Sequence, residues 1–303
     1  MGKRFKEFKK SVKSLDAFKT ILFITLIVYV LSIIFVLYFG LVNSLKSEYD
    51  FYRKNYFGLP REGALYGWKF SNYIDMFTEF QVMVKPIGER PRPAYFLEMF
   101  GNSLLYSVGM SIFTIATQVM VAYACAKYTF KGRNLLYNIA IVVMIIPIIG
   151  ALASEVQLAN TLQLRNSFVG VCIMRCKYPG IYFLVFYATF KSISWTYAEA
   201  AQIDGASHLK IFLNIMLPLV SSTLTAVFVL QFIGNFNDYQ TPMIFIPDSP
   251  TIAYGLFLYK SDTQIAPTKV LAATMFSCVP VVILFIIFRN KIMGNINVGG
   301  IKG

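Results

Sequence analysis

Long apolar runs alternate with shorter polar stretches along most of the chain. Six of these runs approach or exceed the roughly 20 mostly apolar residues that a helix needs to cross a bilayer. They cover residues 20–42, 101–126, 135–154, 170–190, 211–237 and 270–288. The pattern therefore predicts an all-α membrane protein with six transmembrane helices.

Charged residues and prolines interrupt some of the apolar runs. Arg175 and Lys177 lie inside the fourth run, and Pro280 lies inside the sixth. A further apolar stretch, 239–259, contains prolines and an aspartate. Because proline disrupts a helix, we expect this stretch to be an outer loop or a re-entrant segment and not a seventh span.

Composition agrees with a membrane protein, and charge assigns its orientation. Of 303 residues, 56% are hydrophobic and only 14% are charged, whereas about 25% are charged in soluble proteins. The net charge of +13 would suggest nucleic acid in a soluble protein. Here, basic residues gather in the N-terminal tail, in the 127–133 loop and near the C-terminus. Such residues mark cytoplasmic segments, so both termini are expected in the cytoplasm and no nucleic-acid partner is expected.

The segment 44–97, between the first two predicted spans, is expected on the outer side. Its acidic and basic residues nearly balance, as is typical of a translocated loop, and it is rich in aromatic residues. Two interpretations fit the aromatic residues equally well: a small packed cap, or a belt at the membrane interface.

Residue types suited to catalysis or metal binding are scarce. His208 is the only histidine, and Cys125, Cys172, Cys176 and Cys278 are scattered. No GxxxxGK[ST] loop occurs, so ATP is not expected to bind in the P-loop manner. We therefore expect no catalytic residues, no metal site and no cofactor, and the chain is not expected to be an enzyme.

The loop between the fourth and fifth runs carries the most specific pattern. Residues 191–218 read KSISWTYAEAAQIDGASHLKIFLNIMLP. A helix is predicted over 197–203, Gly205 suits the left-handed residue that ends such a helix, and Ser207 can cap a second helix. Periodicity alone leaves two roles open for this helix–turn–helix: contact with a partner protein, or contact with lipid headgroups.

The same loop resembles the EAA loop of type I ABC importer permeases, whose transmembrane domain is called MetI-like. The shared pattern, EAAxxDGAx(5)FxxIxLP, runs from Glu199 to Pro218. Shorter motifs point to the maltose-type second permease of the carbohydrate-uptake group. They are Asn-Ser-Leu at 102–104, Phe-Lys-Gly-Arg-Asn at 130–134, Met-x-x-Pro at 144–147 and Gly-Asn-Phe-Asn-Asp at 234–238, where that group has Trp in the third place. Segment 44–97 matches no such motif.

The resemblance implies a pore-forming subunit of a larger assembly in a bacterial-type cytoplasmic membrane. Its partners would be a second homologous permease in a heterodimer, two ATP-binding subunits and an extracytoplasmic solute-binding protein, besides the lipid bilayer. The implied substrate is a saccharide, with an oligosaccharide favoured and an acidic one as an option. Another solute, such as a sugar phosphate, is the alternative.

The resemblance also assigns roles along the chain. The ATPase-coupling residues would be Glu199, Ala200, Ala201, Asp204, Gly205 and Ala206, and Lys302 and Gly303 would belong to a tail at the ATPase interface. The expected organisation is a basic cytoplasmic tail over 1–19, a first transmembrane helix over 20–43, an extracytoplasmic segment over 44–97, a five-helix permease core over 98–292 that contains the loop 191–218, and a glycine-rich cytoplasmic tail over 293–303.

Charged side chains inside the predicted spans are candidates for the substrate pathway, because burying a charge in a bilayer is costly. Glu155, Arg175 and Lys177 fall near the expected outer ends of spans three and four. The three residues could form a cationic collar for an acidic saccharide. Alternatively, Glu155 and Arg175 form a structural pair, or the side chains reach the outer interface.

Polar residues of the fifth span are a second set of candidates. They are Gln231, Asn235, Asn237 and Asp238. Their amide and carboxylate groups could bind sugar hydroxyls, or they could hold neighbouring helices together.

Two other classes of protein explain the sequence less well than a transporter subunit does. A self-sufficient six-helix channel or carrier would leave the EAA loop without a role, and no inverted repeat is visible. A membrane-embedded enzyme would need paired acids, a histidine cluster or a nucleophile motif, and the sequence has none of them.

Overall fold

The computed structural model describes residues 17–61, 63, 67–86, 88, 90–146, 150–262 and 265–294. Within these ranges, three helices are long and apolar enough to cross a membrane: Lys19–Ser44, Phe96–Lys127 and Pro267–Asn290. A fourth candidate is a bent pair, His208–Leu219 and Ser221–Phe236, with 76° between its parts. The prediction of a mostly helical membrane protein is confirmed. Of the six predicted spans, the first, second, fifth and sixth correspond to these four candidates.

The chain divides into two compact units. The first comprises residues up to Ile74 together with Gln264–Met275, and the second comprises Asp75–Thr263 together with Phe276–Gly303. Residues 1–16 of the expected basic tail over 1–19 and residues 295–303 of the expected tail over 293–303 lie outside the described residues.

The first unit contains α2 (Ala17–Ser44), α3 (Glu48–Tyr52) and the start of both α4 (Ser71–Glu79) and α16 (Pro267–Gly294). The described residues of α2 are apolar and exposed over nearly their whole length, which suits a helix surrounded by lipid. The α2 helix meets α16 at Gly40, where an added Cβ would lie 2.5 Å from the Met275 side chain.

Buried polar groups organise the segment that follows α2. Lys46 is fully buried; its ammonium group donates to Asn43 Oδ1 at 3.0 Å and to the Asn55 carbonyl. Asp50 is also fully buried, and Asn55 donates to both of its carboxylate oxygens, at 3.2 and 3.1 Å. Nearby aromatic rings are in contact, such as those of Phe51 and Tyr56 at 5.1 Å. The segment is therefore a packed structure, in agreement with the first of the two interpretations.

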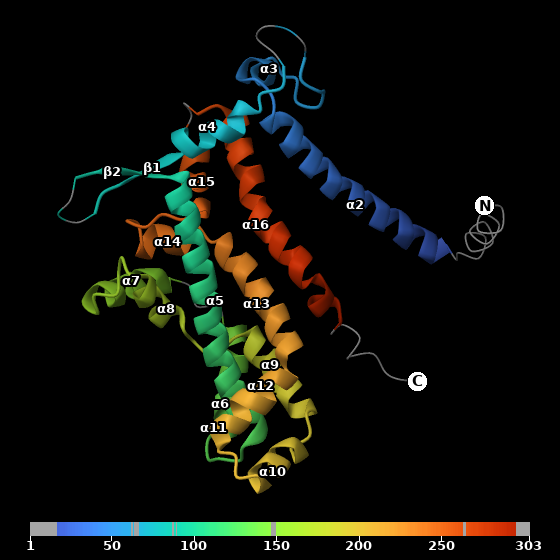
Figure 1. The fold of residues 1–303 in the computed structure, drawn as a ribbon, viewed down its shortest axis with the longest axis vertical. Helices are drawn as coiled ribbons and strands as arrows, with labels where there is room; N and C mark the ends of the chain where they lie inside the picture. The colour runs from blue at the N-terminus through green and yellow to red at the C-terminus, as the bar shows by residue number, and fades with distance from the viewer. Residues whose placement is uncertain are drawn as a thin grey trace. The chain divides into compact units, whose positions relative to one another are not determined.

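The second unit is built on α5 (Phe96–Lys127), the long helix drawn in green in Figure 1. It follows an antiparallel hairpin of β1 (Gln81–Val84) and β2 (Arg92–Tyr95), in which Gln81 pairs with Tyr95 and Val84 with Arg92. Two helices pack along α5: α9 (Ile181–Ser192) and α13 (Ser221–Phe236). Their contact buries an aromatic and aliphatic core that includes Phe183, Phe186 and Phe190.

The predicted third span is not one continuous helix. It consists of α6 (Arg133–Ile145) and part of α7 (Ala151–Thr161). Ile146 is extended, as expected before a proline, and Gly150 has a positive φ of 83°. The apolar pattern does not reveal this break, because it counts hydrophobicity and not backbone conformation. Residues 147–149, which include the proline of the Met-x-x-Pro motif, lie outside the described residues.

The predicted fourth span is also divided. The helix α8 (Phe168–Arg175) ends just before Cys176, and α9 starts at Ile181. Between them lie Lys177 and the Pro179–Gly180 pair, which disfavour a continuous helix. The two charged residues thus lie at a helix break and not within a span.

The stretch 239–259 contains two short helices where a loop or a re-entrant segment was expected, and neither helix is among the candidate spans of the described residues. It forms α14 (Gln240–Phe245) and most of α15 (Ile252–Ser261). Pro242 falls in the first turn of α14, where its missing N–H is tolerated, and Thr251 caps α15 by accepting from Tyr254 N at 3.4 Å. Pro242 does not prevent helix formation because it lies at the start of a helix.

Candidate functional site

The loop 191–218 forms the predicted helix–turn–helix. The first helix is α10 (Thr196–Ile203), and Gly205 after it has a φ of 76°, the left-handed conformation that glycine adopts easily. Ser207 caps the second part by accepting from Lys210 N at 3.4 Å. That part runs through α11 (His208–Ile211), a π-helical turn at Phe212–Met216 and α12 (Leu217–Leu219) into α13.

The helix–turn–helix has one buried face and one exposed face. Ala198, Ile211 and Met216 are fully buried against the core of the second unit. The EAA pattern singles out six residues. Ala201 is buried, Ala206 is half-buried, and the other four are exposed: Glu199, Ala200, Asp204 and Gly205. Three large apolar side chains are exposed beside them: Tyr197 at 55%, Ile203 at 87% and Leu209 at 66%.

Aromatic contacts join this element to the end of α5. The Tyr128 hydroxyl lies 3.1 Å from His208 Nδ1, and its ring meets that of Trp195 edge-on at 5.6 Å. Tyr123 contacts Phe212 at 4.8 Å, and the Lys127 ammonium donates to the Ile193 carbonyl. The helix pair is therefore held to α5 by side chains that the sequence analysis did not single out. Aromatic residues on both sides of the loop could have indicated these contacts. They do not stand out in a chain in which 16% of the residues are aromatic.

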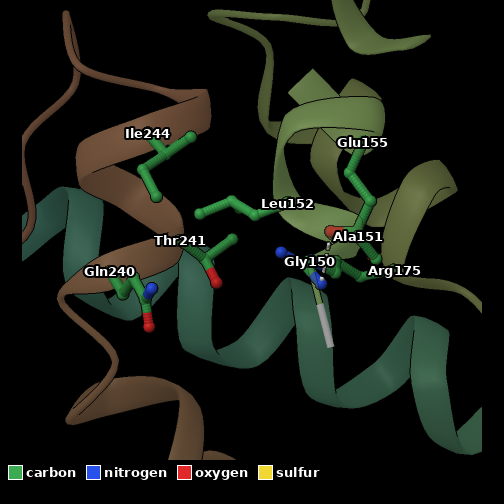
Figure 2. Close-up of a pocket in the computed structure, with 8 residues that line it drawn as sticks. All are labelled: Gly150, Ala151, Leu152, Glu155, Arg175, Gln240, Thr241 and Ile244. Carbon is green, nitrogen blue, oxygen red and sulfur yellow. Dashed lines mark ion pairs between the residues drawn. The ribbon is translucent and has the colours of Figure 1, made fainter. Parts of the chain in front are cut away.

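A polar pocket lies between α7, α8 and α14, as Figure 2 shows. Its volume is about 340 Å³, and its lining residues are Gly150, Ala151, Leu152, Glu155, Arg175, Gln240, Thr241 and Ile244. Arg175 Nη1 lies 3.1 Å from Glu155 Oε2, and the guanidinium lies 5.2 Å from the Phe245 ring centroid. A carboxylate, a guanidinium, an amide and a hydroxyl together can donate and accept hydrogen bonds in several directions. Such a set suits a hydroxylated ligand.

The structure separates the three charged candidates. Glu155 and Arg175 form the expected pair, and each is about one-third exposed or less. Lys177 is exposed and does not line the pocket with them. A collar made of both cations is therefore not what the structure contains, because the carboxylate neutralises one of them.

The polar residues of the fifth span mostly contact the protein itself. Asn235 donates to Ser111 Oγ at 3.1 Å, and Asp238 accepts from the Tyr106 hydroxyl at 2.9 Å. Asn237 donates to a carbonyl of its own helix at 2.8 Å. Gln231 is half-buried. Asn235 therefore holds α13 against α5, and Asp238 holds the residues just after α13 against it. This supports the helix-packing interpretation of these two residues.

Some residues of this polar region escaped the sequence analysis. Tyr106 and Ser111 on α5 bind the polar end of α13, and Gln240 and Thr241 line the pocket. The spacing of four between Ser103, Ser107 and Ser111 was a usable signal, since small residues at that spacing allow close helix packing. The predicted tail residues Lys302 and Gly303 lie outside the described residues. Among the described residues, no three His, Cys, Asp or Glu side chains are grouped so as to hold a metal ion.

Residues 118–297 match the protein family described as binding-protein-dependent transport system inner membrane component. This segment includes the helix–turn–helix, the pocket and most of the core of the second unit. The chain belongs to this family. It is an ABC importer permease with a MetI-like domain, and the resemblance drawn from the EAA pattern is confirmed.

Individual relatives agree with the family match. The permease is 32% identical to the arabinooligosaccharides transport system permease protein AraQ of Halalkalibacterium halodurans over 235 residues, which cover 77% of this chain and 79% of that protein. It is 27% identical to the diacetylchitobiose uptake system permease protein NgcG of Streptomyces coelicolor over 237 residues, 77% of this chain and 74% of that one.

The fold has a counterpart among solved structures. A chain of a bacterial ABC transporter involved in the import of the acidic polysaccharide alginate superimposes with a TM-score of 0.74. The match covers 90% of this chain and 95% of that chain, at 20% sequence identity. The importer permease fold therefore extends beyond the family match and includes much of the chain before residue 118.

Proposed function

We propose that this permease forms half of the pore of an ATP-driven importer that moves a saccharide across the cytoplasmic membrane. Relatives named for arabinooligosaccharides, diacetylchitobiose and maltodextrin support an oligosaccharide as the substrate class. The pocket lined by Glu155, Arg175, Gln240 and Thr241 supplies suitable hydrogen-bonding groups. The alternative within the same family is another solute, such as a sugar phosphate.

The single observation that carries the coupling role is the exposed apolar face of the helix–turn–helix. Ile203 is 87% exposed, although it ends a helix whose opposite face is buried. Apolar groups in such an arrangement mark an interaction surface. An ATPase subunit is the partner that the EAA pattern implies, with Glu199, Asp204 and Gly205 at the contact. In a permease that binds an ATPase, this exposed apolar surface has a role. In a self-sufficient channel it would have none.

The anchoring of the helix–turn–helix gives the proposed coupling a mechanism. Tyr123 and Tyr128 attach it to the end of α5, and Phe212 continues it into α12 and α13. When two ATPase subunits close, a helix pair held in this way moves with α5 and α13 as a rigid body. ATP hydrolysis is assigned to those subunits and not to this chain. The tail residues Lys302 and Gly303 are assigned to the same interface.

The remaining partners follow from the family and from charge. An extracytoplasmic binding protein delivers the saccharide, in agreement with the family description, and a second homologous permease completes the pore. Both termini and the helix–turn–helix face the cytoplasm, and residues 44–97 face outward. Gln231, Asn235, Asn237 and Asp238 border the pathway, where Asn235 and Asp238 act through helix packing.

The experiment that tests this function is affinity purification of the tagged permease from its native membrane. We expect ATPase subunits, a second permease and a binding protein to co-purify. Ile203→Glu should remove the ATPase subunits only. The matched control is Leu162→Glu, because Leu162 is also apolar and exposed, at 54%, but lies at the end of α7. Equal ATPase recovery with Ile203→Glu and wild type would contradict the proposed coupling surface.

A further inference from the structure

The break between α8 and α9 carries a lysine with no ion-pair partner among the described residues. The α8 helix ends at Arg175, and five residues separate it from α9. Arg175 is paired with Glu155, whereas Lys177 is exposed and has no acidic side chain within ion-pair distance in the part of the chain that the structure describes. Of the two cations at this break, Arg175 and Lys177, only Lys177 has no carboxylate beside it among the described residues.

Contacts with α5 give the depth of this break. Cys176 Sγ lies 3.4 Å from the Phe113 carbonyl and 3.3 Å from Thr117 Oγ1. An added Cβ at Gly180 would lie 3.0 Å from Gln118 Nε2. The break therefore lies beside the stretch of α5 between Phe113 and Gln118.

By helix length, that stretch is expected near the middle of the bilayer. Lys127 ends α5 and is followed by the basic residues of the 127–133 loop, so it marks one boundary of the apolar span. At 1.5 Å per residue, Phe113 and Gln118 lie about 21 and about 14 Å along α5 from Lys127. A hydrocarbon core about 30 Å thick has its centre at about 15 Å. By this measure, Lys177 is expected nearer to the middle of the bilayer than to the outer end of a span.

A non-helical segment with a charged side chain is stable at this depth only against protein or water. Unpaired backbone groups and an ammonium group are both strongly disfavoured by lipid. The neighbouring Gln118 Oε1 is buried and has no hydrogen-bond partner among the described residues. This region thus has polar groups in excess of what its own side chains satisfy.

We infer that Lys177 lines the water-filled substrate pathway and binds a carboxylate of an acidic saccharide, such as a uronate. This inference rests on the proposed importer function and specifies its substrate class. An ammonium group at low dielectric binds a carboxylate through charge-assisted hydrogen bonds and gains little from a neutral sugar. The neutralised Glu155–Arg175 pair contributes only hydroxyl recognition. The selectivity of the pathway for negatively charged saccharides therefore depends on Lys177.

The first arm of the test measures access to water. In a permease with its four cysteines replaced by serine, Lys177→Cys is exposed to a membrane-impermeant, charged methanethiosulfonate in the assembled transporter. The control is Val28→Cys, on an α2 helix that is exposed and apolar all round. We expect modification at position 177 and none at position 28. Equal protection of both positions would place Lys177 in lipid or in a closed contact and would overturn the inference.

The second arm measures selectivity in the reconstituted importer with its binding protein. The probes are two tri-uronides, trigalacturonate and an alginate trisaccharide, against maltotriose and cellotriose. We expect wild type to import a tri-uronide, and Lys177→Gln to lower its kcat/KM tenfold or more. Lys177→Arg should retain most of it. Arg165→Gln, which removes an exposed cation in the turn between α7 and α8, should leave it unchanged.

The outcomes separate this inference from the proposed function. Import of neutral trisaccharides alone would overturn the role of Lys177 while leaving a saccharide importer. Import of no saccharide would overturn both. Unchanged tri-uronide import by Lys177→Gln, or loss of the second permease from that variant, would show that Lys177 does not bind the substrate, and the latter result would assign it to the subunit interface.

Discussion

The Arg175 guanidinium lies 3.1 Å from the Glu155 carboxylate, and this contact joins the last residue of α8 to the first half of α7. Both helices are short, and neither continues through a whole predicted span. The ion pair thus connects two helices that are each only a few turns long. It also fixes the wall of the polar pocket in Figure 2.

We expect Glu155→Gln and Arg175→Gln to destabilise the purified permease non-additively. Because both side chains are partly exposed, the coupling free energy should be about 0.5–1 kcal/mol. A double-mutant cycle on thermal unfolding in detergent measures it. The control cycle pairs Glu155→Gln with Arg165→Gln, for which the coupling should be near zero. A coupling equal to that of the control would mean that the pair does not stabilise the fold.

Gly205→Val should disrupt the turn between α10 and α11. The positive φ of 76° is costly for a β-branched residue, by about 1–2 kcal/mol or more, although the space around Gly205 is open. Gly101→Val is the matched control, since Gly101 has equally open surroundings but lies within α5. Gly205→Val should insert normally into the membrane but recover less ATPase. Gly101→Val should not reduce ATPase recovery. Full transport by this variant would remove the coupling assignment.

Tyr128→Ala should uncouple ATP hydrolysis from uptake more strongly than Tyr128→Phe. The alanine removes the ring contact with Trp195 and the hydroxyl contacts with His208 and Tyr123, whereas phenylalanine removes only the hydroxyl contacts. The measurement is the ratio of transported saccharide to hydrolysed ATP in proteoliposomes. Tyr29→Ala, on the exposed surface of α2, serves as the control. Equal ratios for all three variants would show that the aromatic anchor does not transmit movement.

Lys46→Met should destabilise the segment after α2 by about 1–3 kcal/mol, because Asn43 Oδ1 and the Asn55 carbonyl lose their donor. Burial lowers the pKa of Lys46 below its ordinary 10.5, against the opposing effect of Asp50. The unfolded chain then holds this proton more tightly, so the contribution of this site to stability rises as pH increases toward 10.5. Thermal unfolding between pH 7 and pH 10 should show this slope in wild type.

The slope should be absent in Lys46→Met. Lys69→Met is the control for charge, because Lys69 belongs to the same segment but is exposed. It should change the free energy of unfolding by less than about 0.5 kcal/mol. A Lys46→Met protein as stable as Lys69→Met would mean that the buried network has no stabilising role.

Orientation can be tested at Ser71, which is exposed at the start of α4. The charge pattern predicts that this residue faces outward and that Glu199 faces the cytoplasm. In a cysteine-free permease, Ser71→Cys should react with an impermeant thiol reagent added to intact cells. Glu199→Cys should react only after the membrane is opened. Labelling of Ser71→Cys from the inside alone would reverse the topology.

Much of the fold follows from the sequence because it depends on local patterns. Length and hydrophobicity are enough to place α2, α5 and α16, since a long apolar run has few alternatives to a spanning helix. The turn at Gly205 and the cap at Ser207 were also predictable, because each depends on the properties of one residue type. The EAA pattern identified the family for the same reason: its residues are contiguous.

The tertiary structure decided which polar groups meet. Glu155 follows the third apolar run and Arg175 lies in the fourth, and only the packing of α7 against α8 brings them within 3.1 Å. The same packing leaves Lys177 without a carboxylate among the residues that the structure describes. The position of Lys177 beside the middle part of α5 likewise comes from the contact between Cys176 and Phe113, which are far apart in the sequence. Hydrophobicity along a chain is a sum over neighbours, whereas charge pairing depends on distance in space. The sequence therefore determined that this protein crosses a membrane, and the tertiary structure determined which charges are paired among the residues that it describes.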